Sequence, residues 1–170
     1  MIRKVFLVFI FFLLIVPSYS AGSGSGAEDD ATILKGTRMA TEYKKAVEAI
    51  KSAKKLDKKG KKEKAKAKYY SAYTYLIKAN KVEPGDPDIL NYLGFTSRKL
   101  GNYQDAEIYY LLGLDQDPNH VGINEYLGEL YVITQRIEMA KERLKVLKNC
   151  KCKEYEELKE IIKGTKKSKY

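Results

Sequence analysis

Two stretches of this chain align without gaps when one is shifted by 34 residues against the other. The matching positions are a Leu-Gly pair, an alanine and a proline: Leu93-Gly94 and Leu127-Gly128, then Ala72, Ala106 and Ala140, then Pro84 and Pro118. A fixed period of 20–50 residues is typical of proteins built from stacked structural units. The period therefore limits the fold to architectures in which each unit packs on its neighbours along one axis.

The order of these positions resembles the tetratricopeptide repeat family, whose unit is a pair of antiparallel helices. In the second stretch Tyr131 follows the Leu-Gly pair by three residues, as the family's pattern requires. The resemblance is strongest for a repeat at residues 87–120 and continues in a second repeat at 121–152. It implies an all-α fold, a short α-solenoid of antiparallel helix pairs.

The small and rigid residues at these positions also have a direct physical reason. Gly94 and Gly128 remove a side chain where the first helix of a pair approaches its partner closely. Pro84 and Pro118 cannot continue a helix, so each is expected to end one. Asp86-Pro87 combines a capping residue with proline at the first helical position, which predicts a helix start.

The flanking segments are expected to extend the stack at both ends. Residues 39–86 are predicted to form a degenerate first repeat, because Gly60 falls where a helix interior would lie. They are expected as a long basic helical hairpin that turns at Gly60. Residues 153–163 have apolar side chains at helical spacing and predict a capping helix for the last repeat. Residues 164–170 form a basic tail.

The N-terminus indicates export. Arg3 and Lys4 precede an uncharged apolar run over residues 5–16, and small residues follow Pro17. This is the pattern of a signal peptide, expected over residues 1–20 with cleavage near Ser20. An uncleaved membrane anchor is the alternative, although the apolar run is shorter than the roughly 20 residues that span a bilayer. Residues 21–38 are rich in Gly, Ser and acidic residues and are expected to be a flexible leader. We therefore predict an exported protein, periplasmic or secreted, and the C-terminal end resembles that of small exported bacterial members of the tetratricopeptide family.

Charge divides the chain into three parts. Residues 35–69 carry a net charge of +10, residues 83–129 carry −7 and residues 141–170 carry +6. The lysine run Lys51–Lys68 could attract an anionic envelope surface, or it could be a solvated helix face. Nucleic acid is not expected as a partner because the chain is predicted to leave the cytoplasm.

The family resemblance implies a concave groove lined by the first helix of each repeat. Carried over position by position, the groove residues are Asp88, Asn91, Tyr92, Phe95, Arg98, Glu125, Tyr126, Glu129 and Val132. Acidic and aromatic side chains predict a ligand with Lys or Arg beside an apolar anchor. Capture of a C-terminal carboxylate is not expected. The leading hypothesis is a scaffold or assembly factor that binds a peptide or protein segment in this groove.

The two cysteines leave a second hypothesis open. Cys150 and Cys152 could form a structural disulfide, a redox-active pair or a soft-metal site. A thiol–disulfide component is therefore an alternative to the scaffold. The sequence shows no catalytic constellation, so no enzyme activity, cofactor or metal is expected, and the single histidine, His120, is expected in a turn. The oligomeric state and the identity of the partner do not follow from the sequence.

Overall fold

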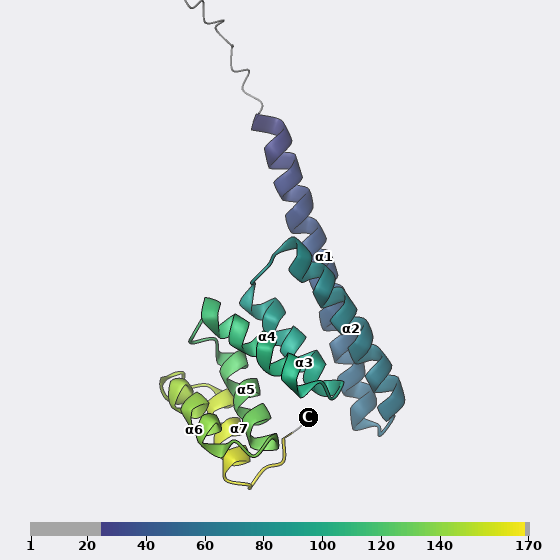
Figure 1. Cartoon of the computed structure of the whole chain (residues 1–170). Helices are drawn as coiled ribbons and strands as arrows, with labels where there is room; N and C mark the ends of the chain where they lie inside the picture. The colour runs from purple at the N-terminus through teal and green to yellow at the C-terminus, as the bar shows by residue number, and fades with distance from the viewer. Residues whose placement is uncertain (1–24, 169–170) are drawn as a thin grey trace, which may run out of the picture.

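The computed structural model describes residues 25–168, with side chains from residue 34 onward. This part of the chain contains only helices, arranged as antiparallel pairs that stack along one axis (Figure 1). The helices are α1 (Ser25–Lys58), α2 (Lys62–Val82), α3 (Pro87–Lys99), α4 (Tyr103–Gln116), α5 (Val121–Ile133), α6 (Ile137–Val146), the short 3-10 helix η1 (Leu147–Asn149) and α7 (Lys153–Ile162). The expected all-α solenoid is confirmed.

The first hairpin, α1 and α2, is longer than the others. α2 has 21 residues and α4 has 14, and the difference of seven residues is about two helical turns. The turn between α1 and α2 contains Gly60, whose φ of +69° lies in the left-handed region that glycine adopts at little cost. Alanines on both helices, including Ala46 and Ala72, are fully buried and let the two helices pack closely.

The predicted flexible leader is wrong for residues 25–38, because α1 begins at Ser25. No proline interrupts the sequence between Ser25 and Lys58, so nothing in it prevents one continuous helix. The first turns of α1 extend past the end of α2 (Figure 1). The signal peptide expected over residues 1–20 lies outside the described residues.

The pair α3–α4 follows the local signals closely. Asp86 accepts a hydrogen bond from the backbone N–H of Ile89 at 2.8 Å, and Pro87 is the first helical residue, which confirms the expected helix start. A Cβ on Gly94 would overlap the ring of Tyr110 on α4. The glycine is therefore required by the close approach of α3 to α4.

The pair α5–α6 is closed by α7. A Cβ on Gly128 would overlap Leu158 of α7, so this glycine admits the final helix, whereas the sequence predicted that it admits the partner helix within the repeat. α7 buries Leu158 and Ile161 and packs mainly on α5. The α5–α6 turn uses Gln135 with a φ of +62°, at the position that Gly101 occupies 34 residues earlier.

The helices form two layers. The first helices of the pairs contact one another through ring pairs such as Tyr43 with Tyr92 and Phe95 with Tyr126. The second helices contact through Tyr73 of α2 and Tyr109 of α4, whose hydroxyls lie 3.0 Å apart. In a helical repeat stack the first-helix layer forms the concave face. None of the helices in the described part has the length and apolar character needed to cross a bilayer.

Candidate binding groove

The predicted groove residues do lie together on the first-helix layer. Tyr92, Phe95 and Arg98 project from α3, and Tyr126 and Glu129 project from α5. The ring of Phe95 lies 5.4 Å from that of Tyr126 and 5.9 Å from that of Tyr69. The guanidinium of Arg98 lies 5.4 Å from the Tyr126 ring centre. These contacts join α3 to α5 within the first-helix layer, and Tyr69 packs against Phe95 from α2 in the second-helix layer.

Most of these residues are nevertheless not accessible, which corrects the expectation of an open acidic and aromatic groove. The relative exposures are 7% for Asn91, 0% for Phe95, 4% for Arg98, 5% for Glu125 and 1% for Glu129. Phe95 belongs to the core between repeats, and the Lys54 ammonium covers its ring at 4.6 Å. A position-by-position transfer from the family cannot foresee this, because the burial depends on the neighbouring helices.

The open part of the face lies between α1 and α3. A pocket of about 360 Å³ is lined by apolar and aromatic side chains and by four lysines: Val47, Ile50 and Tyr92, with Lys51, Lys54, Lys55 and Lys58. We call it the basic pocket. Only Tyr92 of this set was among the predicted groove residues. The missed signal is the i, i+4 spacing of Val47 with Lys51 and of Lys51 with Lys55 on one face of α1.

The chemistry of the basic pocket favours an anionic group beside an apolar one. Burial raises the pKa of the Tyr92 hydroxyl, and the Asp88 carboxylate adds to the rise. Tyr92 therefore stays a neutral hydrogen-bond donor at physiological pH. Lys51, Lys55 and Lys58 are exposed around the apolar floor, so their ammonium groups are free to turn toward a bound anion.

The opposite end of the face, between α5 and α7, is acidic and closed. Glu125 and Glu129 of α5 lie with Glu154 and Glu157 of α7, and we call these four residues the carboxylate cluster. Arg98 pairs with Glu129 at 3.1 Å, and both side chains are almost fully buried. Burial raises the pKa of Glu125 to about 8, with further contributions from Glu129 and from a hydrogen bond with Glu157. Glu125 is thus largely protonated at neutral pH.

The C-terminal tail, residues 163–168, covers this acidic end. After α7 the chain reverses at Gly164, whose φ is +72°, and returns toward α5 (Figure 1). The Ser168 hydroxyl donates to Glu129 Oε2 at 2.8 Å. Lys166 Nζ lies 3.5 Å from Glu157 and 3.4 Å from Glu160. The sequence predicted a basic tail but gave no sign that it would return to the groove.

The remaining predicted groove residues lie at the edges. The Asp88 side chain is exposed and lies 3.2 Å from His120 Nε2, while His120 Nδ1 accepts from the backbone N–H of Ile123. His120 therefore caps the N-terminus of α5 and links it to α3, in keeping with its predicted place in a turn. Val132 is half-buried near the end of α5.

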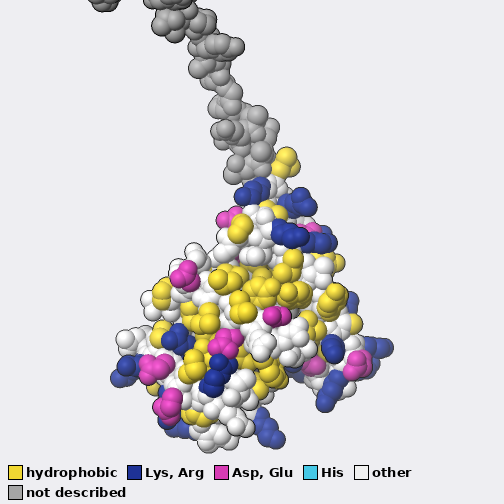
Figure 2. Space-filling model, in the orientation of Figure 1, with side chains coloured by type: hydrophobic (Ala, Val, Ile, Leu, Met, Phe, Trp, Pro, Cys, Tyr) yellow, Lys and Arg dark blue, Asp and Glu magenta, His cyan; other side chains and the backbone are white. Residues whose placement is uncertain are grey.

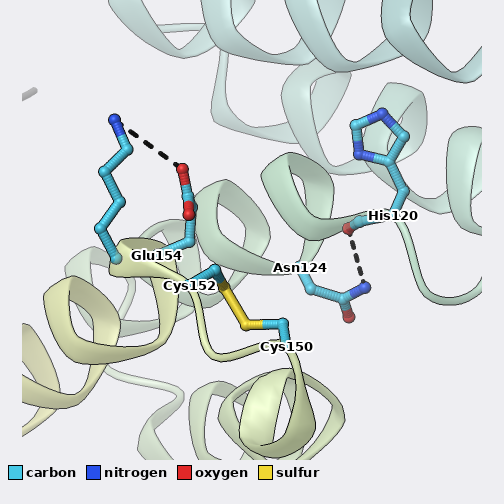
Figure 3. The surroundings of a disulfide bond; sticks show 6 residues. His120, Asn124, Cys150, Cys152 and Glu154 are labelled. Atoms are coloured by element: carbon cyan, nitrogen blue, oxygen red, sulfur yellow. Dashed lines mark hydrogen bonds and ion pairs between the residues drawn. A yellow bond between two sulfur atoms is a disulfide. The ribbon is translucent and has the colours of Figure 1, made fainter.

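The cysteine pair lies at the start of α7, two residues before Glu154 of the carboxylate cluster (Figure 3). Cys150 and Cys152 form a disulfide between η1 and α7, and Cys152 is the residue that precedes α7 (Figure 3). Nearby, Asn124 of α5 donates to the backbone carbonyl of His120 at 3.0 Å. Lys151, between the two cysteines, has a φ of +49°. The bridge therefore constrains the turn that delivers α7 to α5. Among the described residues no group of His, Cys, Asp and Glu could hold a metal ion.

Two further surfaces are accessible. Apolar side chains gather over α4 in Figure 2, where Ile108, Leu111 and Leu112 are exposed. The lysine run on the hairpin is mostly exposed. At the hairpin turn, Asp57 Oδ2 lies 2.7 Å from Lys99 Nζ and accepts a hydrogen bond from the Tyr69 hydroxyl at 2.9 Å. Burial alone would raise the pKa of Asp57, but these two hydrogen bonds outweigh it and lower the pKa.

Comparison with known proteins agrees with this architecture. Residues 87–120 match the sequence model of the tetratricopeptide repeat. Among solved structures, the chain is similar to the first TPR domain of Spaghetti (RPAP3) bound to the HSP90 peptide SRMEEVD, with 21% sequence identity and a TM-score of 0.51. The similarity covers 72% of this chain and 94% of that one. No curated protein matches the chain significantly.

Proposed function

Because the chain is a tetratricopeptide-repeat protein, we propose that it is a protein-interaction scaffold that holds a short segment of another protein on its concave face. The basic pocket between α1 and α3 carries this proposal. It is the part of the face that combines an apolar floor with exposed charged groups. The solved neighbour holds a peptide, which supports a peptide or protein segment as the kind of ligand.

The pocket defines the chemistry of the segment. An apolar side chain would fill the space over Val47 and Ile50, and an adjacent carboxylate would meet the lysines of α1. This reverses the charge expected from the sequence, because the acidic residues of α5 are buried and covered by the C-terminal tail. A volume of about 360 Å³ suits one or two side chains of a short segment.

We further propose that the mature chain begins after Ser20 and acts outside the cytoplasm, as an assembly factor in the cell envelope. The signal-like N-terminal sequence supports this location. N-terminal sequencing of the protein recovered from the periplasm or medium tests it. Recovery with residues 1–20 still attached, in the membrane fraction, would favour the anchor instead.

Selection of binding peptides from a random library tests the pocket. We expect enrichment of sequences that place Asp or Glu next to a bulky apolar residue. In the full chain, Lys51→Glu combined with Lys55→Glu should weaken the selected peptide at least tenfold, about 1.4 kcal/mol. Lys64→Glu combined with Lys68→Glu makes the same change in net charge on exposed α2 positions and is the matched control.

The same pair of variants separates the alternatives. Loss of binding in the α1 variant alone supports the pocket. An equal loss in both variants would indicate attraction to the lysine run as a whole, as expected for an anionic surface, and would contradict the pocket. Selection of peptides without acidic residues would contradict the proposed segment chemistry.

A further inference from the structure

The C-terminal tail is held in place by more than one interaction. The backbone N–H groups of Thr165 and Lys166 both donate to the carbonyl of Glu160, at 3.1 and 3.3 Å, which fixes the reversal after α7. Beyond this turn, Lys166 reaches Glu157 and Glu160, and Ser168 reaches Glu129. Contacts on α5 and on two positions of α7 therefore define one path for the tail.

The tail and the surface beneath it are complementary in charge. Residues 163–170 contain four lysines and no acidic residue. The carboxylate cluster places four glutamates against one buried arginine, Arg98. The carboxylates are crowded. Burial and the neighbouring glutamates raise the pKa of Glu125 to about 8. A positively charged segment lying on the cluster offsets the repulsion among its members.

We propose that the tail is a built-in ligand of the acidic end of the groove, and that a lysine-bearing partner segment of similar sequence binds there when the tail leaves. With the tail in place, the basic pocket is the main open part of the concave face. Release of the tail extends the face across α5 to α7. The inference rests on the proposed function in that the concave face is taken to be the binding face.

Replacement of the tail by a partner segment is favoured because each contact between the tail and the carboxylate cluster is weak. Lys166 is half-buried and Glu160 is exposed, and such ion pairs contribute about 1 kcal/mol or less each. The tail is tethered to α7, which gives it a high effective concentration at the cluster without strong contacts. A competing segment therefore needs affinity of its own or a high local concentration.

The test uses the full chain and a tail variant, Lys166→Glu combined with Ser168→Glu, which places negative charges against Glu157 and Glu129. Lys163→Glu combined with Lys167→Ala makes the same change of three charge units at exposed tail positions and is the matched control. The probe is a free peptide with the sequence of residues 163–170, added to 15N-labelled protein. Backbone order parameters of residues 165–168 are measured in the same samples.

We expect order parameters near 0.85 for the tail of the unmodified chain and the control, and below 0.6 in the tail variant. The free peptide should shift amide resonances of α5 and α7 and bind the tail variant at least fivefold more tightly than the unmodified chain. Equal binding to all three proteins, no binding to the tail variant, or an equally mobile tail in every sample would overturn the proposal. None of these outcomes depends on the selected peptides, so either proposal can fail while the other stands.

Discussion

The two ends of the concave face differ in whether their charged side chains are exposed or buried. At the α1–α3 end, lysines surround an apolar pocket and remain exposed. At the α5–α7 end, glutamates are buried, one is paired with a buried arginine, and the chain's own tail lies over them. A set of groove positions therefore does not by itself define a binding surface, because a partner can reach only those positions whose side chains are accessible.

The largest expected effect separates buried from exposed charge. Arg98→Met leaves the Glu129 carboxylate buried without its partner and should lower the free energy of unfolding by about 3–5 kcal/mol. Lys55→Met at the open end should change it by no more than about 0.5 kcal/mol. Urea denaturation measures both. A similar small effect at the two positions would remove the distinction between the closed and open ends.

Glu125 should make stability depend on pH. Its folded pKa of about 8 lies above the usual value of 4.5, so the folded protein binds a proton that the unfolded chain releases between these values. The stabilising contribution is complete below pH 4.5 and is lost as pH rises to about 8. Glu125 faces Glu129, Glu154 and Glu157. Glu125→Gln should remove the pH dependence and raise the free energy of unfolding at pH 8 by about 4 kcal/mol.

Thermal unfolding at several pH values measures this prediction. The matched control is Glu138→Gln, because the Glu138 side chain is 84% exposed and makes only a surface ion pair with Lys141. The two pH profiles should differ between pH 5 and pH 8. Parallel profiles for Glu125→Gln and the unmodified protein would show that the carboxylate cluster is already solvated and open.

The disulfide should contribute less to the free energy of unfolding than these charged residues do, because it closes a very short loop. Replacing Cys150 and Cys152 with serine should lower the free energy of unfolding by about 1–2 kcal/mol. The loss should appear as earlier exchange of amide protons in α7, which carries half of the carboxylate cluster. Unchanged α7 protection, together with insulin-reductase activity in the unmodified protein, would favour the redox alternative over the structural role.

The smallest expected effect compares two equivalent turns. Gln135 adopts a left-handed backbone conformation where the preceding repeat has Gly101. Gln135→Gly should therefore raise the free energy of unfolding by about 0.5–1 kcal/mol, because glycine adopts this conformation with less strain. Gly101→Gln should lower it by a similar amount. Chemical denaturation of both variants checks the pair, and equal signs for the two changes would contradict it.

Much of the fold could be predicted from local sequence. Asp86-Pro87 fixes the start of α3, and Gly94 marks the close approach of α3 to α4. Gly60 marks the turn of the long hairpin. These features depend on one or two neighbouring elements, so the sequence spacing carries the information. The start of α1 is not predicted, because the Gly- and Ser-rich composition favours a flexible segment although no residue after Ser25 prevents a helix.

The binding face could be predicted only in part. The sequence predicted that Tyr92, Phe95 and Glu129 share one layer of helices, as they do, but their accessibility depends on the side chains that cover them. Lys54 of α1 covers Phe95, and Ser168 of the tail covers Glu129. Both contacts join residues more than 35 positions apart, a range at which periodicity gives no information.

Binding in the basic pocket is tested most directly by an NMR titration of the 15N-labelled chain with the selected peptide, which carries an acidic and an apolar side chain. Binding in the basic pocket should shift the amide resonances around Val47 and Lys51 on α1, and around Tyr92 on α3, first, and these shifts should saturate together. Resonances of the exposed apolar residues on α4, including Ile108 and Leu112, should stay unchanged. Saturating shifts on α4 with none around Val47 and Tyr92 would show that the peptide binds elsewhere than in the basic pocket.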